Sequence, residues 1–231
     1  MARLARTVFA GVPHHVVQRG NRREDVFFAD ADRRAYLGWL AEYAKVADVD
    51  VIAYCLMTNH IHLVAVPAAA DGLQRLLKPL HTRYALRVNR TRGSAGHVWQ
   101  GRFFSSALDD VHLWAAIRYV ERNPVRAGMV RRAEDHPWSS ASAHCGLRAD
   151  PVLTQSRAWR DRLAAIDDWS GWLAEDVEAT QVDLLRRHLD SGLPCGSDAF
   201  VSGLEAIAGR SLRYRPRGRP RKAAIEPALG R

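Results

Sequence analysis

The fold of this chain is decided in the stretch Ala53-Tyr54-Cys55-Leu56-Met57-Thr58-Asn59-His60-Ile61-His62-Leu63-Val64. Apolar residues flank Thr58-Asn59 on both sides, a pattern typical of two strands joined by a short hairpin turn. Side chains alternate between the two faces of a strand, so we expect His60 and His62 on one face and their apolar neighbours in a core. Two imidazoles on one face can share a divalent metal ion. A pair of surface histidines in a hairpin is the alternative, and the spacing alone leaves both open.

The segments around this hairpin predict an α+β domain. We expect a strand at 12–19, a helix from Asp30 to about Val46, hairpin strands at about 51–57 and 60–66, a helix from Asp71 to about Asn89 kinked or broken at Pro79, a strand within 97–107, and a helix from Asp109 or Asp110 to about Arg122. Strands in pairs separated by helices indicate a ferredoxin-like, mostly antiparallel sheet with helices packed on it. We assign this domain to residues 1–148.

The rest of the chain divides into a helical extension at 149–209 and a basic tail at 210–231. Apolar residues recur at helical spacing in the extension, Ser191-Gly192 predicts a turn, and Ser197 is expected to cap a further helix. Two short helices joined by such a turn are typical of a helix-turn-helix or of a small helical bundle. The tail is rich in arginine, proline and glycine, and we expect it to be disordered on its own.

The charge of the chain is unevenly distributed. The 231 residues carry a formal net charge of +9, of which residues 1–149 contribute +8, residues 150–209 contribute −6 and residues 210–231 contribute +7. A merely soluble protein would intersperse its charges. Two basic parts separated by an acidic one suit a polyanionic partner such as nucleic acid.

The composition argues against several other classes of protein. No apolar run approaches the roughly 18 residues that a membrane span needs, and the N-terminus is not followed by an apolar signal core. The three cysteines are scattered and form no C-x-x-C pair, so neither a disulfide framework nor a thiolate zinc site is indicated. We expect a cytoplasmic, nucleoid-associated protein with no membrane partner.

The helix predicted at about 109–122 carries a tyrosine beside its core face. Tyr119 and Asn123 are four residues apart and therefore lie together on the flank of the stripe formed by Leu113, Ile117 and Val120. A tyrosine in this position is usually a packing residue whose hydroxyl reaches water. The helix alone does not distinguish that role from a nucleophile.

Several motifs occur in a fixed order along the chain. They are Arg19-Gly20-Asn21-Arg22, the histidine hairpin, Trp99-Gln100-Gly101-Arg102-Phe103, Arg118-Tyr119-Val120-Glu121-Arg122-Asn123-Pro124-Val125-Arg126-Ala127-Gly128-Met129-Val130 and Trp138-Ser139-Ser140. Together they resemble the REP-associated tyrosine transposases, bacterial relatives of the single-strand transposases that have a His-hydrophobic-His site. The resemblance spans about residues 8–148. It departs from the family pattern at His14-His15-Val16, where an aromatic residue is expected before His-Val. We expect this departure to affect strand packing more than chemistry.

The resemblance implies a role for each matching residue. His60 and His62 match the metal ligands, Tyr119 matches the nucleophile, and Asn123 falls where relatives place a polar side chain that completes the metal site. The family implies Mg²⁺ or Mn²⁺, although imidazoles by raw affinity favour zinc, nickel or copper.

The implied activity is that of a metal-dependent single-stranded DNA endonuclease and strand transferase. It would cleave hairpin-forming repeats through a 5′-phosphotyrosine and religate them without a nucleotide cofactor. The absence of a G-x-x-x-x-G-K-[ST] motif agrees with this. The expected partner is single-stranded or hairpin DNA, bound by a monomer or a homodimer.

Three groups of residues are candidates for DNA contact. Arg19, Asn21, Arg22 and Arg23 are expected to hold phosphates or unpaired bases, or else form a solvated basic turn. Trp99 and Arg102 are expected to stack or pair with the strand near the cut, although Trp99 fits a core equally well. In the tail, Arg217, Arg219, Arg221 and Lys222 belong to a run that resembles an AT-hook, which lays arginines in a narrow minor groove. A basic tail also binds DNA by counterion release without reading it.

Rival functions remain open to different degrees. A non-catalytic DNA-binding regulator on a transposase scaffold is the main alternative, and the intact His60, His62 and Tyr119 argue against it. A histidine phosphoesterase would need two H-x-[ST] motifs, and the chain has none. A carboxylate-triad transposase is disfavoured because no acidic residue falls within the predicted central strands.

Overall fold

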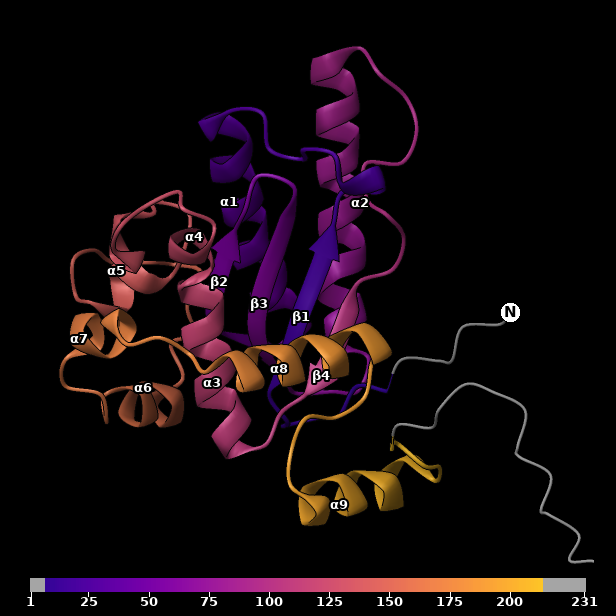
Figure 1. The fold of residues 1–231 in the computed structure, drawn as a ribbon. Coiled ribbons are helices and arrows are strands. Elements are labelled where there is room, and N and C mark those ends of the chain that lie inside the picture. The colour runs from indigo at the N-terminus through magenta and orange to yellow at the C-terminus, as the bar shows by residue number, and fades with distance from the viewer. Residues whose placement is uncertain (1–6, 214–231) are drawn as a thin grey trace, which may run out of the picture.

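The computed structural model describes residues 7–213 and shows the predicted elements in the predicted order (Figure 1). The first part consists of β1 (His14–Arg19), α1 (Asp30–Ala47), β2 (Val49–Leu56), β3 (His60–Pro67), α2 (Gly72–Arg92), β4 (Phe104–Ala107) and α3 (Asp110–Glu121). The second part consists of α4 (Asn123–Arg126), α5 (Ala141–His144), α6 (Arg157–Leu163), α7 (Trp169–Ala174), α8 (Ala179–Ser191) and α9 (Asp198–Ala208). Short 3₁₀ turns lie at Asn21–Arg23 and Ala133–Asp135.

The four strands form one antiparallel sheet in the order β2-β3-β1-β4. Both β1 and β2 run antiparallel to β3, which lies between them, and α1 makes the crossover that connects them. This is the split βαβ arrangement of a ferredoxin-like fold. The predicted fold class, α+β with a ferredoxin-like antiparallel sheet, is therefore confirmed.

One face of the sheet is covered by α1 and α2 (Figure 1). Its core is apolar and contains buried side chains from both helices and from β2 and β3, among them Tyr36, Leu40, Leu76, Leu80, Tyr54 and Leu63. The sequence suggested a kink or a break at Pro79, and the helix α2 is unbroken there. Proline removes one hydrogen bond from the helix ladder, and the leucines on either side of it hold the helix against the sheet.

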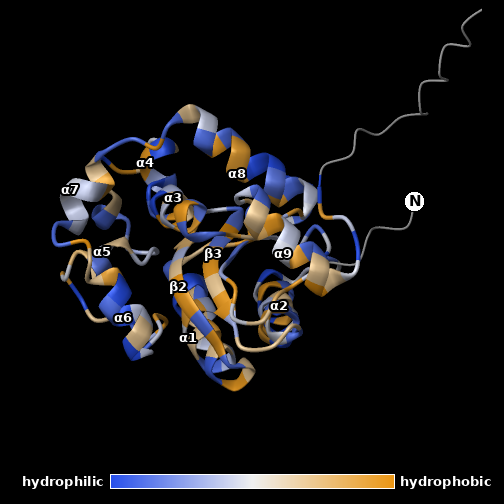
Figure 2. Ribbon diagram, turned by 90° about the horizontal axis from the view of Figure 1, so that it is seen from below, coloured by the Kyte–Doolittle hydropathy of each residue, from blue (hydrophilic) through white to orange (hydrophobic). Residues whose placement is uncertain are grey.

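The opposite face is covered by α3 and by α8 of the C-terminal extension, and α7 belongs to the same apolar cluster. Ile52 and Val64 of the sheet meet Ile117 of α3 and Leu185 of α8 in a second apolar cluster. Figure 2 shows the apolar strands β2 and β3 enclosed between the helices. The extension is helical, as predicted, and it shares a core with the sheet. The boundary at residue 148 stays a prediction.

The last helix, α9, packs beside the end of the sheet. Its Val201 and Leu204 form a small cluster with Phe9, Ala107 and Leu212. Ser197 caps the helix by accepting a hydrogen bond from the Phe200 backbone N–H at 3.2 Å, as the sequence predicted. The helix carries no lysine or arginine, so it offers no basic side chain to a phosphate.

Across residues 7–213, no helix has the length and apolar character required to cross a membrane.

Candidate active site

The histidine hairpin is fixed at its turn by the end of β1. The Met57 N–H donates to the His60 carbonyl at 2.9 Å and closes the turn, while the Gly20 N–H donates to the Asn59 carbonyl at 2.8 Å. Two more backbone N–H groups, of Val26 and Phe27, donate to the Thr58 carbonyl. The turn therefore has a defined register. His60 and His62 share one face of β3, with their ring centroids 4.9 Å apart.

The His60 ring is held in one tautomer by its neighbour. Its Nδ1 lies 2.6 Å from the Asn59 Oδ1, and an amide oxygen can only accept, so Nδ1 carries the hydrogen and Nε2 keeps its lone pair. Burial and the nearby charge of Arg19 lower the pKa of His60 to about 4. The ring is neutral at neutral pH, which a metal ligand requires.

The His62 ring is paired with a histidine from β1. His62 Nδ1 and His15 Nε2 are 2.9 Å apart and the rings stack with centroids 5.2 Å apart. Burial lowers the pKa of His15 to about 3, and burial together with nearby positive groups lowers the pKa of His62 well below its usual value. Both rings are therefore neutral and share one hydrogen. When His62 Nδ1 donates it, the Nε2 of His62 presents a lone pair, and this buried atom has no hydrogen-bond partner among residues 7–213.

Tyr119 comes to these histidines from α3. Its ring meets His15 and His62 edge-on, with centroids 5.7 and 5.6 Å apart, and only 5% of the residue is exposed. The Arg126 guanidinium lies over the ring, 4.6 Å from its centroid. Arg186 of α8 donates a hydrogen bond from its Nε to the phenol oxygen at 3.5 Å. The phenol is therefore surrounded by two imidazoles and two cations.

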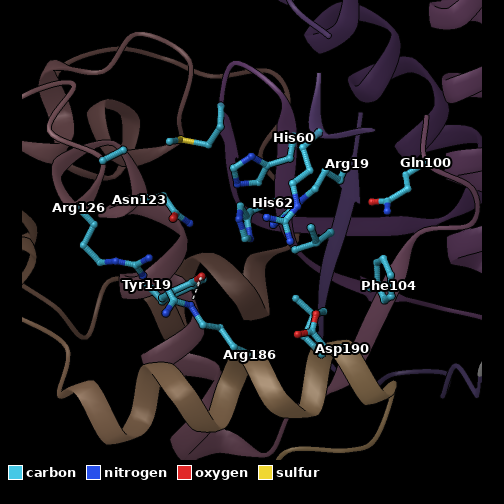
Figure 3. Close-up of a pocket in the computed structure, with 15 residues that line it drawn as sticks. Arg19, His60, His62, Gln100, Phe104, Tyr119, Asn123, Arg126, Arg186 and Asp190 are labelled. Carbon is cyan, nitrogen blue, oxygen red and sulfur yellow. Dashed lines mark hydrogen bonds between the residues drawn. The ribbon is translucent and has the colours of Figure 1, made fainter. Parts of the chain in front are cut away.

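Asn123 stands where α3 ends. The helix ends at Glu121 because Pro124 disfavours a continued helix at the residue before it and has no N–H to donate to Val120, and Asn123 begins the short helix α4. The side chain is buried, and its Nδ2 has no hydrogen-bond partner in the described part of the chain. Figure 3 shows Asn123, Tyr119, His60 and His62 around one cavity. The cavity measures about 760 Å³ and is lined by all four.

The donor set at this cavity fits a divalent metal ion. No group of three or more His, Cys, Asp or Glu side chains with metal-binding geometry is found in residues 7–213. The predicted ligands are instead two imidazoles and one amide, which leave coordination positions for water and substrate oxygens. His62 Nε2 is a buried atom without a partner among residues 7–213, and such atoms are costly unless something binds them. Asn123 would offer its amide Oδ1 as the further ligand. The residues present therefore fit the metal that the sequence predicted.

The predicted DNA-contacting residues differ in their positions. Arg19 and Arg23 line the same cavity as the histidines. Asn21 lines a second hollow of about 310 Å³. Arg22 and Arg102 are exposed. The predicted contacts in the tail, Arg217, Arg219, Arg221 and Lys222, lie outside the described residues.

Trp99 lies in the core beneath α2. It is 8% exposed, its Nε1 donates to the His81 carbonyl at 3.2 Å, and its ring packs against those of His81 and Tyr84. Of the two roles that the sequence left open for Trp99, these surroundings favour packing.

The family model described as "Transposase IS200 like" matches residues 9–123. The chain belongs to the IS200-like transposase family. The matched part runs from the segment before β1 to Asn123, and it includes His60, His62 and Tyr119. This family membership confirms the family resemblance that the motifs indicated.

Two proteins compared with this IS200-like transposase carry more specific names. A Haemophilus influenzae protein named as a REP-associated tyrosine transposase is 28% identical over 102 residues, which cover 39% of this chain and 58% of that protein. A solved structure of a REP-associated tyrosine transposase bound to a REP hairpin matches with a TM-score of 0.53 at 18% identity, covering 68% of this chain and 93% of that one. At this identity the structural match shows a common fold. The match to the curated relative spans little more than half of its length.

Three residues around the tyrosine of this IS200-like transposase were not predicted from the sequence. His15 was assigned to strand packing, yet it is the diagonal neighbour of His62 across the β1–β3 pair, and the register could have revealed it. Arg126 belongs to the motif that contains Tyr119 and Asn123, and its position one helical turn beyond Asn123 was the available signal. Arg186 lies 67 residues from Tyr119, and no local pattern connects the two.

Proposed function

We propose that this IS200-like transposase cleaves single-stranded DNA beside hairpin-forming repeats, with Tyr119 as the nucleophile. The observation that carries the proposal is the convergence of Tyr119, His60, His62 and Asn123 on one cavity, although they come from β3, α3 and α4. The matching solved structure is of a REP-associated tyrosine transposase bound to a REP hairpin, and this supports hairpin DNA as the substrate class. The site would act on chromosomal DNA in the cytoplasm.

The reaction is an exchange of one phosphodiester for another. The Tyr119 phenol oxygen attacks the scissile phosphorus and forms an O–P bond, while the bond from phosphorus to the 3′ oxygen breaks. The phenol loses its proton, and the departing 3′ oxygen takes up a proton to become a hydroxyl. The strand stays attached to the tyrosine through its 5′ phosphate. Attack of a 3′ hydroxyl on this phosphotyrosine reverses the step and religates the strand without a nucleotide cofactor.

A divalent ion, Mg²⁺ or Mn²⁺, would be held by His60, His62 and Asn123 and would neutralise charge on a non-bridging phosphate oxygen. The chain's own residues prepare the site for this chemistry. Asn59 fixes the His60 tautomer, His15 orients the His62 ring, and both ligand imidazoles are kept neutral by burial.

The cavity also provides groups suited to a single strand. Arg19 and Arg23 place positive charge at its edge, while Phe104 and Gln100 supply an aromatic face and a polar group for unpaired bases. All of these side chains, like Tyr119 and the histidines, come from one copy of the chain. The groups that the proposal uses converge within one chain, and this supports action as a monomer, the first of the two predicted states.

The test uses hairpin DNA from repeats around the protein's own gene, carrying a single-stranded flank labelled at the 3′ end. We expect a Mn²⁺- or Mg²⁺-dependent labelled adduct of protein size on a denaturing gel, because the 3′ fragment is the one that stays on the tyrosine. The adduct should be absent with EDTA and in Tyr119→Phe. It should persist in Tyr43→Phe, a matched tyrosine on α1 at the other face of the sheet.

Two outcomes would contradict the proposal. Cleavage without an adduct would indicate metal-assisted hydrolysis by water. Tight binding of the hairpin with neither cleavage nor adduct would favour a DNA-binding regulator built on the transposase scaffold.

A further inference from the structure

We propose that Arg186, from the C-terminal extension, is a catalytic residue of the tyrosine site. Its guanidinium holds the Tyr119 phenol oxygen and binds the phosphate that this oxygen attacks. The inference rests on the proposed function and adds a residue from outside the part matched by the family model, which ends at residue 123.

The position of Arg186 on α8 is the first observation. The helix is anchored by Val182, Leu185 and Leu189, whose spacing defines one packed stripe, and all three are buried. Arg186 is four residues after Val182 and three before Leu189, so it lies at the edge of this stripe, and its side chain is exposed. The edge faces the cavity, since Arg186, Leu189 and Asp190 form one of its walls.

The contacts of Arg186 are the second observation. Its Nε donates to the Tyr119 phenol oxygen at 3.5 Å, and its guanidinium carbon lies 6.0 Å from the centre of the phenol ring. Its ion pair with Asp183, at 3.7 Å, joins two largely exposed side chains. Exposed pairs of this kind contribute little. Tyr119 is therefore the contact that explains where the arginine points, and Figure 3 shows Arg186 reaching from α8 to the phenol.

The chemistry of phosphoryl transfer gives this contact a role. As the O–P bond forms and the bond to the 3′ oxygen breaks, negative charge grows on the non-bridging oxygens. An arginine fork can donate to the attacking oxygen and to a neighbouring phosphate oxygen at once, which aligns the two and stabilises that charge. The guanidinium stays protonated throughout, so it cannot take the phenol proton. That proton passes to solvent, and solvent returns one to the 3′ oxygen.

The geometry also distinguishes Arg186 from the arginine beside it. Both side chains are exposed, but Arg186 lines the cavity and contacts the phenol, whereas Arg187, one residue along the same helix, does not line it. The two residues have the same charge and the same helical environment. Arg187 is therefore the matched control for charge and for helix propensity.

The experiment measures single-turnover adduct formation by the full chain, with the 3′-labelled hairpin substrate at saturating concentration. We expect Arg186→Gln to slow the rate on the order of 100-fold, as removal of one oxyanion donor does elsewhere. Affinity for the uncut strand should change only a few-fold, and the thermal midpoint should stay the same. Arg186→Lys should recover part of the rate, because a point charge replaces the fork. Arg187→Gln should match the wild type.

Several results would overturn the inference. An unchanged rate in Arg186→Gln, with an adduct in the wild type, removes this proposal and leaves the proposed function standing. A faster rate would show that α8 shields the tyrosine instead of assisting it. An equal loss of rate in Arg187→Gln would show that the effect arises from the positive charge of α8 in general and not from the position of Arg186. If Arg186→Gln does not fold, Arg186→Lys decides, since a wild-type rate without the fork contradicts the role. Absence of an adduct in the wild type removes both proposals.

Discussion

The two faces of the sheet are built from the same strands and serve different purposes. On β3, Ile61 and Leu63 point into the apolar core under α1 and α2. Their neighbours His60 and His62 point to the other face, where α3 and α8 leave a cavity. One face packs mainly apolar side chains under α1 and α2, whereas the other combines an apolar cluster with the three neutral histidines His15, His60 and His62.

This difference shows how a small domain can accommodate costly polar groups. On the cavity face, His15 Nδ1, His62 Nε2 and Asn123 Nδ2 are buried without hydrogen-bond partners among residues 7–213. Each such atom costs about 1–3 kcal/mol in the free protein. The apolar core on the opposite face offsets this cost, because strand alternation allows the two faces to vary independently.

The largest effect is expected from a ligand on the cavity face. His60→Ala should lower the single-turnover rate of adduct formation on the order of 1000-fold, because an ion held by His60 would supply several kcal/mol of transition-state stabilisation. The free energy of unfolding should change by less than about 1 kcal/mol, since His60 is only partly buried. Calorimetric titration with Mn²⁺ tests whether His60 is a metal ligand, and urea unfolding tests the expected change in stability. A variant that binds Mn²⁺ as well as the wild type would contradict the ligand assignment.

The reverse pattern is expected one strand position away from the second histidine. Leu63→Ala, on the core face, should lower the free energy of unfolding by about 2–5 kcal/mol, because it leaves a cavity in a fully buried site. The molecules that remain folded at low temperature should form adduct at a rate within a few-fold of the wild type. A large loss of rate in folded protein would show that the two faces are coupled.

The features that the sequence alone could predict are those that depend on neighbouring residues. Alternation and short-range spacing sufficed for the antiparallel sheet, for the shared face of His60 and His62, and for the end of α3 before Pro124. They left a kink or a break in α2 at Pro79 open, and the helix is unbroken there because its leucines pack on the sheet. They also left Trp99 undecided between stacking and core.

The rest of the site depends on contacts between distant segments. Arg186 reaches Tyr119 only because α8 packs across the second face of the sheet, and nothing near residue 186 in the sequence encodes that docking. The pairing of His15 with His62 required the β1–β3 register, which the hairpin alone does not fix. Long-range register and docking are therefore what the sequence could not supply.

The pH dependence of stability at His14 tests the same comparison of the two faces of the sheet. His14 precedes His15 in β1 and lies on the opposite face. Its Nδ1 donates to the Val12 carbonyl at 2.7 Å, and its Nε2 accepts from the Phe9 N–H at 3.3 Å, so a second proton would break the latter bond. Burial lowers the pKa of His14 to about 4. The folded protein therefore keeps His14 neutral between about pH 4 and 6.5, while the unfolded chain takes up a proton.

Stability therefore falls as the pH is lowered, because protonation of His14 favours the unfolded chain. The contribution of His14 to stability is complete above about pH 6.5, and about 3 kcal/mol is lost as the pH falls to about 4. We expect His14→Gln to flatten the slope of unfolding free energy against pH in this window by about one proton, measured by urea unfolding at several pH values. An unchanged slope would show that His14 is not held neutral.

The smallest effect is expected at the cap of α9, remote from both faces. Ser197→Ala should cost about 1 kcal/mol of unfolding free energy, because the Phe200 N–H loses its acceptor. Adduct formation should not change. A loss of activity here would mean that α9 takes part in the site, which the two-face comparison does not include.

The most direct test is to locate the covalent bond. The adduct formed with hairpin DNA would be trimmed with nuclease, digested with trypsin and analysed by mass spectrometry. We expect the tryptic fragment that contains Tyr119, bounded by Arg118 and Arg122, to carry the added mass of a nucleotide linked through its 5′ phosphate. A nucleotide on any other peptide, or no modified peptide from protein that has cleaved its DNA, would contradict the assignment of Tyr119 as the nucleophile.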